Sequence, residues 1–164
     1  MKPYHLVLIL LGISLTGCLT TYEKVEESDK AGFIKFERDV ASPLLGSITR
    51  YVKVDDKQQC RQAYSEHKLL AVHNKGNPLV SGLNVDGLYV KPGNFRILIN
   101  TVAGVGSWCD VFVNFDVIAG QKYKIIASGD AYVGVNKCSA KLYQLTTSGE
   151  YQQAAFNKYY ECNK

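Results

Sequence analysis

Residues 109–128, CDVFVNFDVIAGQKYKIIAS, decide the fold because apolar and polar side chains alternate on both sides of a short turn. A period of two places one set of side chains on a buried face and the other set in solvent. The turn Ala119-Gly120-Gln121 predicts a hairpin that pairs positions summing to about 240. The predicted inward set is Cys109, Val111, Val113, Phe115 and Val117 before the turn, and Tyr123, Ile125 and Ala127 after it.

The preceding segment carries two further turn signals. Asp86-Gly87 lies between Leu83-Asn84-Val85 and Leu88-Tyr89-Val90 and predicts a two-residue hairpin, because a type I′ turn needs positive φ. Lys91-Pro92-Gly93-Asn94 predicts a type II turn, with the proline fixing φ and the glycine in the left-handed region.

Shorter alternating or apolar runs complete an all-β pattern, and no helical period extends over more than about ten residues. In residues 95–102, Phe95, Ile97 and Ile99 should share one face. The sequence therefore predicts one antiparallel β-sandwich of about seven to eight strands over residues 32–164. The other predicted strands lie within 32–38, 47–54, 68–73 and 138–143.

The first residues, MKPYHLVLILLGISLTGC (1–18), have the order of a lipoprotein signal peptide. Lys2 supplies a positive charge, and the apolar run over residues 6–15 is shorter than the ~20 residues of a membrane span. Leu15-Thr16-Gly17-Cys18 resembles the lipobox of bacterial lipoproteins. The resemblance implies cleavage after Gly17 and transfer of diacylglycerol to the Cys18 thiol. The alternative is an ordinary secretory signal that happens to end in these residues.

Several acyl chains would make the attachment permanent, because each buried methylene contributes ~0.8 kcal/mol. The residue after the cysteine is Leu19 rather than Asp. In Gram-negative lipoproteins this points to the outer membrane, on its periplasmic side. The expected organisation is a signal peptide over 1–17, a lipidated cysteine and flexible tether over 18–31, and the sandwich.

Cleavage would remove one of 19 basic residues and none of 15 acids, so the formal charge becomes 18 − 15 = +3. The basic residues are scattered, which does not suggest a nucleic-acid partner. Lys122 with Lys124, and Lys137 with Lys141, occupy positions expected to face solvent.

The four remaining cysteines are Cys60, Cys109, Cys138 and Cys162. An even number in an oxidising compartment predicts two disulfides, with three possible connectivities. We favour Cys109–Cys138 with Cys60–Cys162, because the hairpin predicted at Gly120 brings Cys109 near the strand that Cys138 opens. No CxxC pairs indicate a zinc site, and no neighbouring histidine would activate Cys109 as a nucleophile.

Residues 85–127 resemble a pattern found in many small bacterial lipoproteins. The matching segments are Val85-Asp86-Gly87, then 90–95 (VKPGNF), then 115–123 (FDVIAGQKY). The resemblance implies a PEGA-like or transthyretin-like sandwich. It implies no catalytic residues, because the shared motifs form turns and strands.

Few residues could support catalysis. After cleavage only His67 and His73 could act as a base, and a hydrolase would need one of them beside an acid and a nucleophile. The chain has no GxSxG motif, calcium loop or phosphate loop. Asp55-Asp56 has no distant carboxylate partner for a glycosidase. We therefore expect no enzyme activity, no metal and no cofactor.

Binding is the class that the sequence favours. The chain has 11 tyrosines, whose rigid rings and polar tips suit protein partners and sugars, although strands also use tyrosine for packing. The candidate interaction rim comprises residues 103–108 and 129–137, with Trp108 and Tyr132; Trp108 could equally pack on the disulfide. We expect an outer-membrane lipoprotein acting as a structural or protein-interaction module of the envelope. The alternative is a module that binds glycan or inhibits an enzyme.

Overall fold

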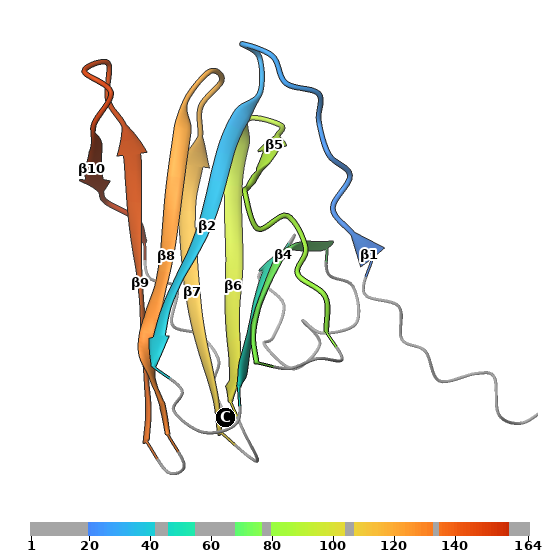
Figure 1. Cartoon of the computed structure of the whole chain (residues 1–164). Helices are drawn as coiled ribbons and strands as arrows, with labels where there is room; N and C mark the ends of the chain where they lie inside the picture. The colour runs from blue at the N-terminus through green and yellow to red at the C-terminus, as the bar shows by residue number, and fades with distance from the viewer. Residues whose placement is uncertain are drawn as a thin grey trace, which may run out of the picture.

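The computed structural model describes residues 20–41, 46–54, 68–76, 80–103, 107–132 and 135–157. Within these ranges the chain forms two five-stranded sheets and no helix, so none of them holds a helix that could cross a membrane (Figure 1). Sheet A has the order β1-β4-β3-β6-β7, and sheet B the order β10-β9-β8-β2-β5. The strands are β1 (Thr20–Thr21), β2 (Gly32–Ala41), β3 (Ser47–Lys53), β4 (Lys68–Lys75), β5 (Leu88–Val90), β6 (Gly93–Ala103), β7 (Ser107–Val117), β8 (Lys122–Tyr132), β9 (Val135–Leu145) and β10 (Tyr151–Ala154).

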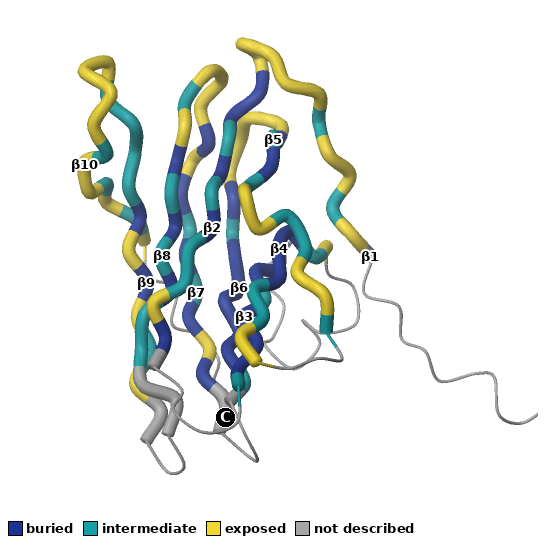
Figure 2. Tube along the Cα trace, viewed as in Figure 1, coloured by how far each residue is buried: buried dark blue, intermediate teal, exposed yellow. Residues whose placement is uncertain are grey.

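The two sheets pack face to face over one apolar core, which confirms the predicted all-β sandwich. Buried and exposed residues alternate along several strands, as Figure 2 shows. Every inward side chain predicted from residues 95–102 and 109–128 is buried. Burying one large apolar side chain contributes ~1.5–3 kcal/mol. The largest fully buried side chains include Tyr51, Phe36, Ile34, Leu70, Ile97, Ile99 and Ile125.

The described residues form ten strands, more than the seven to eight predicted. Seven of them have seven residues or more; the others, β1, β5 and β10, have only two to four residues. The residues of β5 were predicted to be one arm of a hairpin, whereas β1 and β10 are too short to show the alternation that a sequence pattern needs. One long pair is also not antiparallel: β2 runs parallel to β8, from Phe33↔Lys122 to Ala41↔Asp130.

The hairpin predicted at Gly120 is wrong, because β7 and β8 lie in different sheets. β7 instead pairs with β6 along its whole length, ending at Ala103↔Ser107. The turn at 118–121 carries the chain between the sheets, and the Gly120 N–H donates to the Ala31 carbonyl oxygen at 2.9 Å. Alternation specifies which side chains face the core. It cannot distinguish neighbours in one sheet from strands facing each other across the sandwich.

The hairpin predicted at Asp86-Gly87 is also wrong. Leu83 bridges to Val72, whereas β5 pairs with the start of β2. A turn does form, closed by the Gly87 N–H donating to the Asn84 carbonyl oxygen at 3.0 Å. Gly87 has φ +103°, and a Cβ there would lie 2.6 Å from the backbone oxygen of Ile34. Glycine is therefore required because this turn presses against β2.

Residues 20–31, which belong to the predicted tether, make backbone hydrogen bonds to both sheets. β1 runs parallel to the start of β4, and the Tyr22 N–H donates to the Leu69 carbonyl oxygen at 3.0 Å. The Val25 N–H donates to the Tyr89 carbonyl oxygen at 3.3 Å. In Figure 1 this segment runs from β1 along the side of the sandwich to the start of β2. Side-chain polarity gave no sign of this docking, since the backbone makes these bonds.

Candidate functional site

A groove of about 460 Å³ opens where the N-terminal segment meets sheet A. Four stretches that are far apart in the sequence form it: the segment after β1, the end of β3, the start of β4 and the β5–β6 connection. Its described lining contains four lysines and one glutamate, so these residues carry a net positive charge. We call it the basic groove and define it by Lys24, Lys53, Lys68, Lys91, Glu23, Tyr22 and Phe95.

Two aromatic rings form part of the groove wall. The rings of Tyr22 and Phe95 lie 6.1 Å apart between centroids. The Lys53 ammonium lies 5.0 Å from the Phe95 ring centre and 5.8 Å from that of Tyr22. Cation–π contacts of this kind contribute ~0.5–1 kcal/mol at exposed sites. They hold the Lys53 charge in the groove and link the N-terminal segment to β6.

A disulfide between Cys109 of β7 and Cys138 of β9 joins the two sheets, with Cα atoms 6.0 Å apart. The predicted pairing is confirmed, but the geometry used to predict it is wrong. The bridge does not follow from a β7–β8 hairpin; it spans the core between strands of opposite sheets. The second predicted pair, Cys60 and Cys162, lies outside the described residues, as do Cys18 and the lipobox.

The candidate interaction rim lies at the end of the sandwich where β6 ends and β7 begins, at the bottom of the view in Figure 1, and Cys109 of the disulfide is two residues from Ser107. The β6–β7 hairpin closes there at Ala103↔Ser107, and the β8–β9 hairpin at Tyr132↔Val135. Most residues predicted to be loop are strand: Trp108 belongs to β7 and Tyr132 to β8. The rim therefore consists of two narrow hairpin ends.

Just inside the rim, a row of polar residues crosses the inner face of sheet A. Register places His73, Thr49, Thr101 and Cys109 side by side on β4, β3, β6 and β7. The hydroxyls of Thr49 and Thr101 are hydrogen-bonded at 3.0 Å, and both residues are buried. A buried polar group destabilises the fold unless it is hydrogen-bonded.

Arg38 of β2 reaches toward this row from sheet B. Its guanidinium donates to the side chain and the backbone oxygen of Ser47 and to the Val40 carbonyl. Burial, the larger cause, and the nearby Arg38 charge lower the pKa of His73 below its ordinary value. Within the described residues, Arg38 Nε and His73 Nε2 are buried without hydrogen-bond partners. Such groups are commonly satisfied by buried water.

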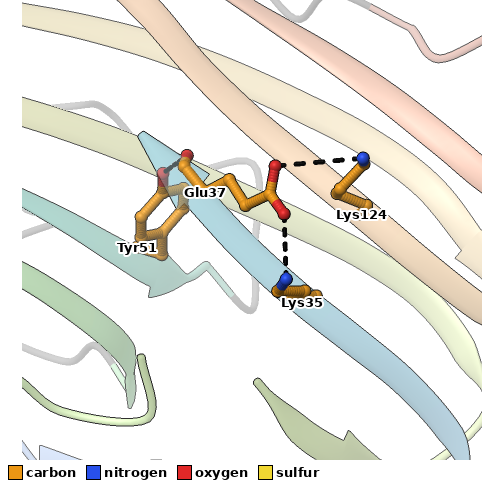
Figure 3. A network of polar contacts seen from close by, with 4 residues as sticks. All are labelled: Lys35, Glu37, Tyr51 and Lys124. Atoms are coloured by element: carbon orange, nitrogen blue, oxygen red, sulfur yellow. Dashed lines mark hydrogen bonds and ion pairs between the residues drawn. The ribbon is translucent and has the colours of Figure 1, made fainter. Parts of the chain in front are cut away.

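The outer face of sheet B carries a second polar network (Figure 3). The Glu37 carboxylate lies 3.0 Å from the Lys35 ammonium and 3.9 Å from that of Lys124. The Glu37 carbonyl oxygen accepts the buried Tyr51 hydroxyl at 2.5 Å, and burial raises the Tyr51 pKa. The Lys124 ammonium also lies 4.6 Å from the Tyr151 ring centre. Lys35 and Lys124 therefore both lie near the Glu37 carboxylate, and Lys124 also contacts an aromatic ring.

The described residues bring together no arrangement for hydrolysis. The His73 ring packs edge-on against Tyr51 at 5.8 Å between centroids, and its Nε2 has neither an acid nor a nucleophile as partner within the described ranges. His67, the other candidate base, lies outside them. Among the residues that the structure places, no group of three His, Cys, Asp or Glu side chains could hold a metal ion.

Comparison with known proteins identifies no relative: no family model, no curated protein and no solved structure matches this chain. The site must therefore be interpreted from its own geometry.

Sequence reasoning missed both the basic groove and the polar row. The groove lysines come from four separated segments, so no local cluster reveals them. For the polar row a signal existed. Ser47, Thr49 and Tyr51 recur with period two in β3, and Arg38 stands in phase with Ile34 and Phe36 in β2. That phase placed polar side chains on an inward face.

Proposed function

We propose that this chain is a lipid-anchored protein of the outer membrane, facing the periplasm, and that it acts as a non-enzymatic interaction module of the envelope. The resemblance to small lipoproteins with PEGA-like sandwiches is part of the same proposal. One observation supports it above the others. Thr20 and Thr21, two and three residues after Cys18, are paired with β4, so a lipid on that cysteine would hold the folded domain close to the membrane.

The geometry gives such a domain two distinct ends. β6 leads from Phe95 in the basic groove to Ala103 at the rim, eight residues further on, which corresponds to roughly 27 Å at the rise of a strand. An anchor near the groove would therefore present the rim away from the membrane. Trp108 and Tyr132, next to the hairpin ends, are our candidate partner contacts.

The test is crosslinking in intact cells, followed by mass spectrometry. A photo-crosslinking amino acid is placed at Ser107 or Val135 on the rim, and as a matched control at Lys141, which is exposed on β9. We expect the rim positions to capture the same envelope protein reproducibly and the control position to miss it. Adducts absent from both rim positions would refute a protein-interaction role for the rim.

A second groove supports the alternative, a module that binds glycan. It has a volume of about 340 Å³ and lies where β10 and the following residues meet β7. Its lining residues include Asn114, Asp116, Gln144 and Asn157, whose polar groups suit a ligand rich in hydroxyl groups. A glycan array probed with the full chain tests this function, and Asp116→Ala should abolish any signal that depends on the groove.

A further inference from the structure

We propose that the basic groove binds anionic phospholipid head groups of the membrane leaflet that carries the anchor, and thereby seats the sandwich in one orientation. This inference rests on the lipid anchor proposed above. It adds a second, electrostatic attachment point and assigns the face of the domain that contacts the membrane.

The anchor site and the groove are close along the chain. Cys18 precedes Thr20 by two residues, which span at most ~7 Å even when fully extended. Thr20 is paired with Lys68, and Lys68 lines the groove. Lys24 and Tyr22 follow within the same docked segment. A lipid on Cys18 would therefore place the head-group layer beside these side chains.

The charge of the groove complements a phosphate layer. Among the residues that the structure describes, four lysines and one glutamate line the groove, a surplus of three positive charges, while the whole chain has a formal charge of +4. Lys24, Lys68 and Lys91 are exposed on its wall. An ammonium group binds phosphate as a compact point charge with three donors and needs no fixed fork geometry. The groove thus suits mobile head groups better than one rigid ligand.

The remaining wall fits the same environment. Tyr22 supplies an aromatic ring with a polar hydroxyl beside the lysines, and this ring packs against the buried Phe95. Rings with one apolar end and one wet end are favoured where a membrane meets water. The groove is partly open to solvent, so head groups that remain in the leaflet could reach it without leaving the membrane.

The test is lysine footprinting on the full, lipid-anchored chain in vesicles. One set of vesicles contains phosphatidylcholine alone, and the other contains about one third phosphatidylglycerol as well. An amine-reactive reagent labels exposed lysines, and mass spectrometry reports the rate at each position. Lys24, Lys68 and Lys91 should label up to about fivefold more slowly in the anionic vesicles. Lys137 and Lys141, exposed on β9, are internal controls whose rates should not change.

Two double charge-reversal variants, one in the groove and one on β9, test whether the protection depends on the groove lysines. Lys24→Glu with Lys91→Glu alters two exposed groove residues, and Lys137→Glu with Lys141→Glu makes the same charge change on β9. Only the groove pair should abolish the protection of Lys68 by phosphatidylglycerol.

The outcomes distinguish this inference from the proposed anchor. A chain that floats with phosphatidylcholine vesicles, but whose groove lysines label equally on both vesicles, retains the anchor and refutes the head-group site. A chain that fails to float with phosphatidylcholine lacks the anchor and overturns both. Groove lysines protected in intact cells but unprotected on anionic vesicles would assign the groove to an acidic protein partner and refute the lipid assignment.

Discussion

Removing the inter-sheet disulfide by Cys109→Ala with Cys138→Ala should destabilise the domain strongly. The bridge closes a sequence separation of 29 residues. In the chain-entropy model this loop constrains the unfolded chain by ~3.6 kcal/mol at 25 °C. Cys109 is also buried, at 8% exposure, so the lost packing of its sulfur adds about 1 kcal/mol. The expected total loss is ~4–5 kcal/mol in the free energy of unfolding.

Urea denaturation followed by tryptophan fluorescence and circular dichroism measures this loss. The unfolded chain without the bridge is more expanded, so the m-value should rise as the midpoint falls. Val111→Ala is the matched control: it trims the same inward face of β7 without breaking a covalent link, so it should lower the midpoint and leave the m-value unchanged. A loss below about 1 kcal/mol with an unchanged m-value would refute the role assigned to the bridge.

Three further perturbations test the packing. The pKa of His73 lies below its unfolded value of 6.5, so the free energy of unfolding should decrease as pH falls below 6.5; denaturation curves at several pH values should show His73→Gln flattening that dependence. Thermal denaturation should show that Gly87→Ala lowers the free energy of unfolding by at least ~2 kcal/mol, because the added Cβ meets a carbonyl oxygen of β2. Gly149 also has positive φ but no atoms near its Cβ position, so Gly149→Ala should lower that free energy by only ~1 kcal/mol. Thr49→Val should lower the free energy of unfolding by ~1–3 kcal/mol, because it leaves the buried Thr101 hydroxyl without its hydrogen-bond partner. The double variant Thr49→Val with Thr101→Val should recover most of that loss, and a further loss in the double variant would contradict the pairing.

Much of the fold could be predicted from local patterns. Alternation identified the inward faces of β6, β7 and β8, and Gly93 has the positive φ expected of it, at +134°. Strand partners could not be predicted, because a period of two is satisfied equally by pairing within a sheet and by facing across the core. This is why Cys109–Cys138 was identified from a hairpin that does not exist.

The candidate site was less accessible to sequence reasoning. The basic groove joins residues from 22 to 95 and forms only after the N-terminal segment docks on β4. Arg38 follows Ile34 and Phe36 in the period-two pattern of β2, which predicts that it faces inward. Its role could not be inferred from that pattern, because its partner Ser47 is brought next to it only by the fold. Long-range pairing therefore determined what local patterns could not.

The most direct test of the lipid anchor is the mass of the N-terminal tryptic peptide from protein extracted from membranes. An anchored chain gives a peptide from Cys18 to Lys24 that carries diacylglycerol on the cysteine thiol. Cys18→Ala should abolish that species and release the chain from the membrane fraction. An unmodified peptide that contains residues before Cys18, or an unmodified Cys18, would contradict the lipid anchor and with it the assigned membrane-facing groove.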